Sequence, residues 1–150
     1  MTESQNESRI YRFKKITLLG CGQMGSKMAV RMSDSGNIVT VIDKMANSMK
    51  RLPEDRIDSK RIIPVVGDGT LESIMRMAST QDADVYISTT NKTSVNLMSA
   101  LMANYIFQVP EIICVVHDPG LEELANKCGI LIINPLNLVV DNLSDLSQGT

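Results

Sequence analysis

ITLLGCGQMG, residues 16–25, is the stretch that decides the fold of this 150-residue chain. A largely apolar run of four residues, typical of a buried strand, leads into Gly20-x-Gly22-x-x-Gly25, and a helical pattern follows. In a βαβ unit, Gly20 permits the tight turn out of the strand and Gly22 lets a pyrophosphate approach the backbone. Gly25 lets the helix pack closely on the sheet. The motif therefore predicts a nucleotide-binding βαβ unit.

A second apolar run, residues 38–42, ends in Asp43, which lies 18 residues after Gly25. At that spacing an acid can accept hydrogen bonds from ribose hydroxyls, while the helix N-terminus meets the phosphates. Two simpler interpretations stay open: a glycine turn that binds nothing, and an acid that only shapes the turn after its strand.

Strand and helix patterns alternate along the rest of the chain, which predicts an α/β fold: a Rossmann-like, doubly wound, parallel six-stranded sheet in the order 3-2-1-4-5-6. The expected strands are residues 16–19, 38–42, 62–66, 84–90, 112–116 and 130–133. Pro64 falls in the third strand, and a proline, which cannot donate to the ladder, belongs on an edge strand. In this order the third strand is an edge.

Helices are expected after each strand, with residues 54–61 as a charged surface loop. Thr70 is the expected N-cap of the helix after the third strand, with Leu71 among the residues facing the sheet. Thr93 or Ser94 is expected to cap a long helix reaching residue 107, which is apolar over a wide arc and should be covered by more than one neighbour, such as another subunit. Asp118 is expected to cap the next helix, and residues 135–146 form the last.

The composition of the chain argues against several classes of function. The net charge of −2 and the absence of tryptophan give no case for nucleic-acid binding. The three cysteines form no C-x-x-C pair, and with a single histidine no metal site is expected. No apolar run approaches the ~20 residues of a membrane span, and no signal peptide is evident, so we expect a cytoplasmic protein. The domain prediction is a polar tail at residues 1–13 and one Rossmann-like nucleotide-binding domain at residues 14–146.

Ligands bind such sheets at the carboxyl ends of the strands. No catalytic residues are predicted there, because no triad or pair of catalytic carboxylates appears. The expected cofactor-binding residues are Gly20, Cys21, Gly22, Gln23, Met24, Gly25, Asp43, Lys44, Asp68, Gly69, Thr89 and Thr90.

Simpler roles stay open for several of these residues. Asp68 is as well explained by capping the next helix as by an adenine contact. Lys44 fits a phosphate ligand or a solvated surface position equally well. Cys21 fits a small filler of the loop, and His117 fits a loop residue better than an acid–base catalyst.

Residues 14–143 resemble the N-terminal nucleotide-binding domain of the TrkA/RCK family, cytoplasmic regulators of potassium uptake systems and potassium channels. The resemblance rests on the glycine loop and Val41-Ile42-Asp43, and on motifs that differ from ordinary dehydrogenases. These motifs are Val65-Val66-Gly67-Asp68-Gly69-Thr70, Asp82-Ala83-Asp84 with Thr90, Asn96-Leu97, Asp118-Pro119, Gly129-Ile130 and Asn134-Pro135.

The resemblance implies a regulatory site that binds NAD(H), ATP, ADP or AMP, in an oligomeric ring that gates a membrane partner. It implies that Asp43 holds the adenosine ribose, that Asp68 and Gly69 border the adenine, and that Thr90 lies beside the phosphates.

The chain departs from the family pattern in three respects. Many members carry arginine where this chain has Gln23, and another on the fifth strand where it has Cys114-Val115-Val116. Without those cations a triphosphate is a weaker candidate, since it needs charge neutralisation. The usual acid of a T-x-x-D-x-x-N pattern is Thr93 here. The C-terminal ligand domain common in the family is also missing, as in a stand-alone or split member or a piece of a longer chain.

Three hypotheses follow. The first is a nucleotide-sensing regulatory subunit of a potassium uptake system, without turnover, which assembles as a homodimer or larger ring and lies at the inner face of the membrane through its transporter or channel partner. The second is a small NAD-dependent oxidoreductase completed by another chain, and the third is an empty cleft kept for assembly. NAD(H) is favoured over NADP because Asp43 would repel a 2′-phosphate. AMP and ADP remain alternatives to NAD(H).

Overall fold

Six apolar strands form one all-parallel sheet in the order β3-β2-β1-β4-β5-β6, as predicted. The computed structural model describes residues 13–149, so nearly all of the predicted tail at residues 1–13 lies outside the described residues. The strands are β1 (Lys15–Leu19), β2 (Ile38–Asp43), β3 (Ile62–Val66), β4 (Val85–Ser88), β5 (Glu111–Val115) and β6 (Leu131–Ile133). Pro64 lies on the edge strand β3, paired with Val41, and this confirms the prediction made from proline chemistry.

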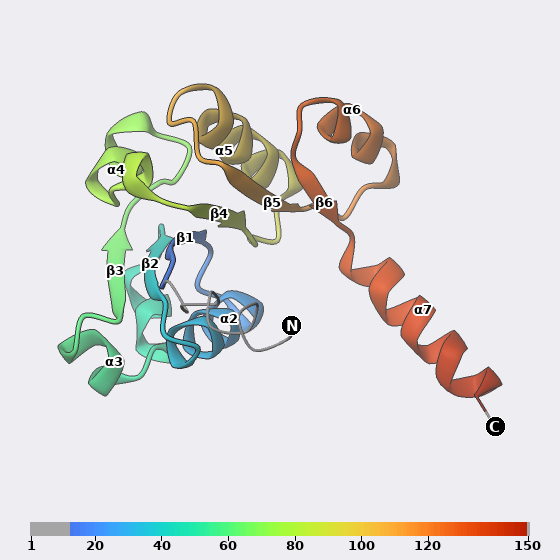
Figure 1. The fold of residues 1–150 in the computed structure, drawn as a ribbon, viewed down its shortest axis with the longest axis horizontal. Coiled ribbons are helices and arrows are strands. Elements are labelled where there is room, and N and C mark those ends of the chain that lie inside the picture. Colours follow the sequence, from blue (N-terminus) through green and yellow to red (C-terminus); the bar gives the residue numbers. More distant parts are fainter. Residues whose placement is uncertain (1–12, 150) are drawn as a thin grey trace, which may run out of the picture.

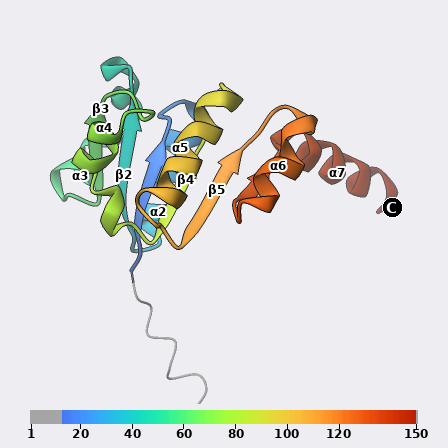
Figure 2. The ribbon, with the colours of Figure 1, turned by 90° about the horizontal axis from the view of Figure 1, so that it is seen from above.

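Helices cover both faces of the sheet (Figure 1; Figure 2). The α-helices are α2 (Gln23–Asp34), α3 (Glu54–Asp58), α4 (Glu72–Met77), α5 (Thr93–Tyr105), α6 (Glu122–Lys127) and α7 (Pro135–Gln148). Within residues 13–149 there are also three 3₁₀ helices: η1 (Ala46–Arg51), η2 (Thr80–Asp82) and η3 (Pro119–Leu121). One core cluster lies between the sheet and the α4–α5–α6 layer, and a second lies under α2 and α3. The sheet is therefore doubly wound, as the alternating pattern predicts.

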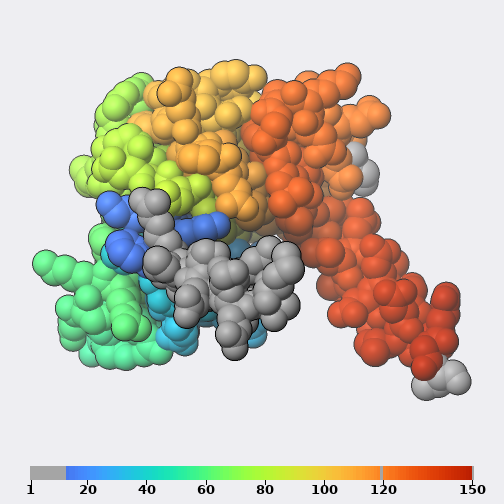
Figure 3. Space-filling model, viewed as in Figure 1, coloured from blue at the N-terminus to red at the C-terminus, as the bar shows by residue number. Residues whose placement is uncertain are grey.

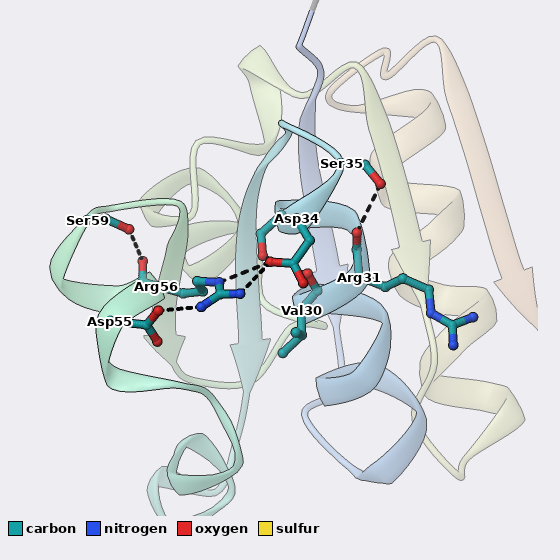
Figure 4. Close-up of polar contacts among 8 residues, drawn as sticks. Val30, Arg31, Asp34, Ser35, Asp55, Arg56 and Ser59 are labelled. Carbon is teal, nitrogen blue, oxygen red and sulfur yellow. Dashed lines mark hydrogen bonds and ion pairs between the residues drawn. The ribbon is translucent and has the colours of Figure 1, made fainter.

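The segment predicted as a loop at residues 54–61 contains the helix α3, so that prediction was wrong. Pro53 precedes its first turn, and Glu54 and Asp55 place negative charge at its N-terminus, where the helix dipole favours it. Arg56 then donates to Asp34 at the end of α2, 2.6 Å from Nη2 to Oδ1, and also pairs with Asp55 (Figure 4). A five-residue helix has no readable hydrophobic period, and its Ile57 anchors it on the second core cluster.

Two of the predicted helix caps were also wrong, and a third was right in position alone. Leu71, not Thr70, is the N-cap of α4, and its side chain is 51% exposed instead of facing the sheet. Lys92 occupies the N-cap of α5, so neither Thr93 nor Ser94 caps that helix. Asp118 does stand at the N-cap of η3, but its side chain makes no capping hydrogen bond.

The last helix, α7, follows β6 after a single residue and extends away from the sheet (Figure 1). None of its residues is buried. In the space-filling view it forms an arm on the body of the molecule (Figure 3). None of the helices in the described part of the chain has the length and hydrophobicity to span a bilayer.

Candidate functional site

A cavity of about 710 Å³ opens at the carboxyl ends of β1, β2, β3 and β4. Its volume lies within the ~300–1,000 Å³ range of small-molecule and cofactor sites. Ten of the twelve predicted cofactor-binding residues line it: Gly20, Gly22, Gln23, Met24, Asp43, Lys44, Asp68, Gly69, Thr89 and Thr90. The other two, Cys21 and Gly25, are buried behind the cavity wall. The strand ends thus bring together segments that are far apart in the sequence.

The three glycines of the loop have different structural roles. Gly20 has φ +106°, a backbone conformation that a side chain strongly disfavours. A Cβ on Gly25 would lie 1.9 Å from the carbonyl oxygen of Gly20, so only glycine lets α2 approach the strand. A Cβ on Gly22 would meet no protein atom within 4 Å, and Gly22 lines the cavity. Gly20 and Gly25 are therefore required by the fold, whereas Gly22 keeps space open for a ligand.

Asp43 fastens this loop to the end of β2. Its Oδ2 accepts a hydrogen bond from the backbone N–H of Cys21 at 2.8 Å, and its Oδ1 accepts from the N–H of Met45 at 2.7 Å. The second bond is the turn-shaping contact that the simpler interpretation expected. Each carboxylate oxygen can accept a further bond, so the group that shapes the loop still offers acceptors to the cavity.

Cys21 contributes its backbone rather than its thiol. The side chain is fully buried, and its Sγ donates to the carbonyl oxygen of Ser48 at 3.3 Å. Burial, and secondly the nearby Asp43 carboxylate, raise the pKa of the Cys21 thiol, and Arg51 opposes this only in part. The thiol therefore stays protonated at neutral pH and is a poor nucleophile.

Asp68 closes its own turn after β3. Its Oδ1 accepts from the backbone N–H of Thr70 at 2.9 Å and from the Thr70 hydroxyl at 2.6 Å. These two bonds lower the pKa of Asp68 below its ordinary value, the hydroxyl having the larger effect. Since Leu71 is the N-cap of α4, the alternative of Asp68 as a helix cap was wrong. Asp68 stands at the cavity wall as a firmly ionised carboxylate.

Behind Thr90 lies the buried amide of Asn96, whose part in joining the strand ends was not predicted from the sequence. Asn96 is fully buried, and its Oδ1 accepts from the backbone N–H and the hydroxyl of Thr90 at 2.9 and 2.6 Å. Its Nδ2 donates to the carbonyl oxygens of Thr90 and Val115, each at 2.9 Å. Asn96 thus ties the ends of β4 and β5 to the first turn of α5.

The neighbouring hydroxyls serve the same purpose. Thr89 donates from Oγ1 to the carbonyl oxygen of Leu19 at 3.0 Å, joining β4 to β1. Thr93 accepts the backbone N–H of His117 at 3.0 Å, which explains why it does not cap α5. The hydroxyl protons of Thr89 and Thr90 are directed at protein acceptors. Both residues also line the cavity, where their hydroxyl oxygens can still accept hydrogen bonds.

The cavity carries more positive than negative charge. Beside Lys44 it is lined by Arg51 and Lys92, against the carboxylates of Asp43 and Asp68. Sequence reasoning missed Arg51 and Lys92. Arg51 ends η1 and donates from Nη1 to the carbonyl oxygen of Cys21 at 3.4 Å, so it reaches the glycine loop from the outside. Its only signal in the sequence is its place in the short helical segment that follows Asp43.

The described residues hold no cluster of three or more histidine, cysteine or acidic side chains arranged to bind a metal ion. What the cavity offers is a glycine loop at a helix N-terminus, an acid beside it and surrounding cations. That arrangement suits a phosphate-bearing nucleoside.

Comparison with known proteins identifies the family. Residues 16–135 match the TrkA-N domain. The chain belongs to the TrkA-N family. The chain is 34% identical over 96 residues to the Trk system potassium uptake protein TrkA of Halomonas elongata, which covers 64% of this chain and 20% of that protein. It is 26% identical over 128 residues to TrkA of Streptomyces coelicolor, covering 85% of this chain and 56% of that protein. The chain therefore spans between a fifth and just over half of these relatives.

Solved structures share the TrkA-N fold. The TrkA-N domain of the inner membrane protein ybaL from Escherichia coli superposes with a TM-score of 0.77 at 18% identity, covering 91% of this chain and 98% of that one. The Kef C-terminal domain of Shewanella denitrificans in its AMP-bound form gives 0.69 at 14% identity, covering 88% and 81%. The GsuK channel bound to NAD gives 0.65 at 15% identity, covering 81% and 21%. At these identities the likeness establishes the fold.

Proposed function

We propose that this chain is a nucleotide-sensing regulatory domain of a potassium uptake system, which binds NAD(H) or an adenine nucleotide without turning it over. The observation that carries the proposal is the braced glycine loop at a cavity of about 710 Å³, with Asp43 fixed beside Cys21 by a 2.8 Å hydrogen bond. TrkA relatives and the NAD- and AMP-bound structures of similar fold support it. The proposed location is the cytoplasmic face of the membrane, through a transporter or channel partner.

The charge of the cavity bears on which nucleotide binds. Gln23 removes one cation from the glycine loop, but Arg51 and Lys92 supply two others at the cavity wall. ADP and ATP therefore remain candidates alongside NAD(H) and AMP, since the phosphates meet positive charge from η1 and from the β4–α5 loop. The cavity-lining groups provide no activated nucleophile, which favours binding over turnover.

Calorimetric titration with NADH, NAD, AMP, ADP and ATP tests the proposal, on the chain, on Gly22→Ala and on two matched pairs of variants. Gly22→Ala adds a methyl group where no protein atom lies within 4 Å, so it should leave the fold intact and weaken binding about tenfold or more. Arg51→Gln should weaken binding of the more highly charged nucleotides, whereas Lys50→Gln, one residue away and outside the cavity lining, should not.

Asp43→Ala should lose nucleotide binding altogether. Asp58→Ala, which removes an exposed acid outside the cavity lining, is its control and should bind normally. Because Asp43 also holds the loop, circular dichroism must show that the variant is folded. No heat with any nucleotide, or unchanged binding by Gly22→Ala, would overturn the sensing proposal. Steady turnover of NADH with a substrate would instead favour the oxidoreductase alternative. Potassium flux into vesicles containing the transporter, with and without this chain and the bound nucleotide, tests the regulatory step.

A further inference from the structure

One face of the sheet is only half covered by the described residues at β1, β2 and β3. Side chains alternate along a strand, and on the face that carries α4 the carboxyl-end residues Leu19, Ile42 and Val65 belong to the first core cluster. Ile63 lies on the same face, two residues before Val65, and is 40% exposed. The six-residue helix α4 therefore covers the carboxyl halves of these strands and leaves their amino halves open.

A second cavity, of about 260 Å³, opens over these amino halves. The strands contribute Lys15, Thr17, Ile38, Thr40 and Ile63 to its lining, and the segment from the end of α4 through η2 forms its side. It shares no lining residue with the cavity at the glycine loop, which lies at the other end of the strands. This second cavity is called the amino-end groove below.

Two hydroxyls in the amino-end groove are free to bind something else. Thr17 and Thr40 lie side by side in the register of β1 and β2. Thr17 is 2% exposed and Thr40 is half-buried, and neither hydroxyl makes a hydrogen bond within residues 13–149. A free threonine hydroxyl can donate to a peptide carbonyl oxygen or accept from a peptide N–H.

Apolar side chains stand beside these hydroxyls. Ile63 is 40% exposed and Met77, at the end of α4, is 68% exposed. An extended peptide presents both apolar side chains and unpaired backbone groups, so it suits a surface of this mixed kind. A cavity of about 260 Å³ is also smaller than the ~300–1,000 Å³ of small-molecule sites. The amino-end groove therefore fits a peptide segment better than a second small ligand.

We infer that the amino-end groove receives the N-terminal segment of its own chain, residues 1–12, with Ile10 and Tyr11 as the anchoring side chains. Apart from Met1, these two are the only large apolar residues of that segment. Ile10 precedes Lys15 of the groove lining by five residues, which span up to about 17 Å. Ile63 lies two strands away from β1, about 10 Å across the sheet. The segment is therefore long enough to cross the groove.

The first described residues direct the segment to this face. The carbonyl oxygen of Lys14 accepts the backbone N–H of Ile38 at 3.1 Å, so the chain is already extended beside β2 before β1 begins. Alternation along an extended chain places Phe13 on the same side as Lys15, which lines the groove. Phe13 is 52% exposed. The segment before Phe13 thus starts on the groove side of the sheet.

Charge complementarity supports the same occupant. Asp82 lines the groove, is exposed and makes no ion pair within residues 13–149. In the N-terminal segment, Arg9 and Arg12 flank the apolar pair, so either guanidinium can lie near that carboxylate. The other charged side chain of the groove, Lys15, has Glu7 of the same segment as a partner of opposite sign. Opposite charges on the two surfaces favour their association.

Tryptophan fluorescence tests the docking, because the chain contains no tryptophan of its own. In the full chain, Tyr11→Trp should give blue-shifted emission and protection from acrylamide quenching. Adding Ile63→Glu places a carboxylate in the groove and should increase quenching at least about threefold. Val66→Glu is the matched control, since Val66 is a 50% exposed residue of β3 outside the groove lining, and it should leave the tryptophan protected.

Two results of the fluorescence experiment would overturn the inference. The first is quenching of the Tyr11→Trp chain equal to that of a free tryptophan, which would leave the groove to a partner protein. The second is protection that Ile63→Glu does not change, which would place Tyr11 elsewhere on the molecule.

A disulfide experiment then shows which chain supplies the segment. In a Cys128→Ser background, a chain carrying Ile10→Cys and Ile63→Cys is oxidised and should form the bond within itself, at monomer mass. The control chain carries Ile10→Cys and Val66→Cys and should react more slowly. Equal rates, or a bond formed only between two chains, would overturn the inference, because the segment would then dock elsewhere or on a second copy. Neither experiment depends on nucleotide binding, so both succeed or fail separately from the proposed sensing function.

Discussion

The cleft end of the sheet and its β6–α7 end differ in what they leave exposed: the first leaves a polar cavity, and the second leaves apolar side chains. At the cleft, polar side chains are held by hydrogen bonds. Asp43 binds the glycine loop and Asn96 binds the ends of β4 and β5, whereas Asp68 binds Thr70 within its own turn. At the other end, α7 buries none of its residues and Leu131 is 55% exposed. One region is rigid and polar with an open space, and the other is apolar and uncovered.

The difference indicates what each region receives. A preorganised polar wall around a cavity suits a small charged ligand, because few groups must be ordered when it binds. The uncovered apolar side chains of α7 suit contact with a protein surface, because such contact gains free energy by removing apolar area from water. The proposed ligand site and the uncovered apolar helix therefore lie in separate parts of one small fold, and variants can perturb either one.

Among variants at the cleft, Gly25→Ala should have the largest effect on stability. Its Cβ would lie 1.9 Å from the Gly20 carbonyl oxygen, so α2 or the loop must move. We expect a loss of more than about 4 kcal/mol in the free energy of unfolding, or failure to fold. Urea denaturation measures it. Gly22→Ala is the control, and an equal loss in the two variants would contradict the assignment of separate roles to the two glycines.

Asn96→Ala is expected to cost about 2–4 kcal/mol, because it leaves the N–H of Thr90 and the carbonyl oxygen of Val115 without their partner in a buried place. Asn104→Ala removes one hydrogen bond, from Nδ2 to Cys128, and should cost about 1 kcal/mol. Urea midpoints compare the two. Similar losses in the two variants would mean that the Asn96 hydrogen bonds behind the cleft contribute no more to stability than the partly buried Asn104 bond.

Features set by local chemistry were predictable from the sequence. The positions of Gly20 and Gly25 follow from backbone geometry, and Pro64 marked an edge strand because proline lacks an N–H. The sheet order followed from the regular alternation of elements. Ten of twelve predicted binding residues line the cavity for the same reason, since the strand ends of this topology meet at one edge.

Features set by tertiary partners were not predictable. Thr93 reads as a helix cap, but its oxygen accepts the N–H of His117, 24 residues away. Thr70 likewise has Asp68 within reach, and that bond wins over capping α4. Arg51 enters the cavity only because η1 folds against the loop. No pattern in residues 135–146 shows that α7 leaves the sheet, because an apolar stripe looks the same on a docked helix.

The core beneath α5, between the two regions, provides a smaller test. Tyr86 is fully buried, and its hydroxyl makes no hydrogen bond of ordinary geometry within residues 13–149, because the nearby Ser99 hydroxyl donates to the carbonyl oxygen of Asn96 instead. Tyr86→Phe should therefore raise the free energy of unfolding, by about 1 kcal/mol, while the exposed Tyr105→Phe changes little. Thermal and urea unfolding measure both, and a clear loss in Tyr86→Phe would reveal a partner for the hydroxyl.

The same residue predicts a dependence on alkaline pH. Burial raises the pKa of Tyr86, and the Ser99 side chain opposes this only in part, so the folded chain keeps the phenolic proton at a pH where the unfolded chain, with a pKa of about 10, has lost it. Stability should then fall as pH rises above about 10, because the unfolded state binds fewer protons. In Tyr86→Phe this fall should be shallower, and equal slopes in the two proteins would contradict the burial effect.

The smallest expected effect belongs to the turn at the cavity wall. The Thr70 hydroxyl and backbone N–H lower the pKa of Asp68, so the ionised form stabilises the folded state above the ordinary carboxyl pKa of about 4, and that contribution is lost as pH falls through the lowered pKa. Thr70→Val removes the hydroxyl alone and should raise the pKa of Asp68. Its cost, about 1 kcal/mol or less, should be present at pH 6 and vanish near pH 2. NMR titration of the Asp68 carboxyl and urea unfolding at both pH values measure this. A cost that persists at pH 2 would come from packing of the turn instead, and the ionised wall that distinguishes the cleft from the α7 end would not depend on this hydrogen bond.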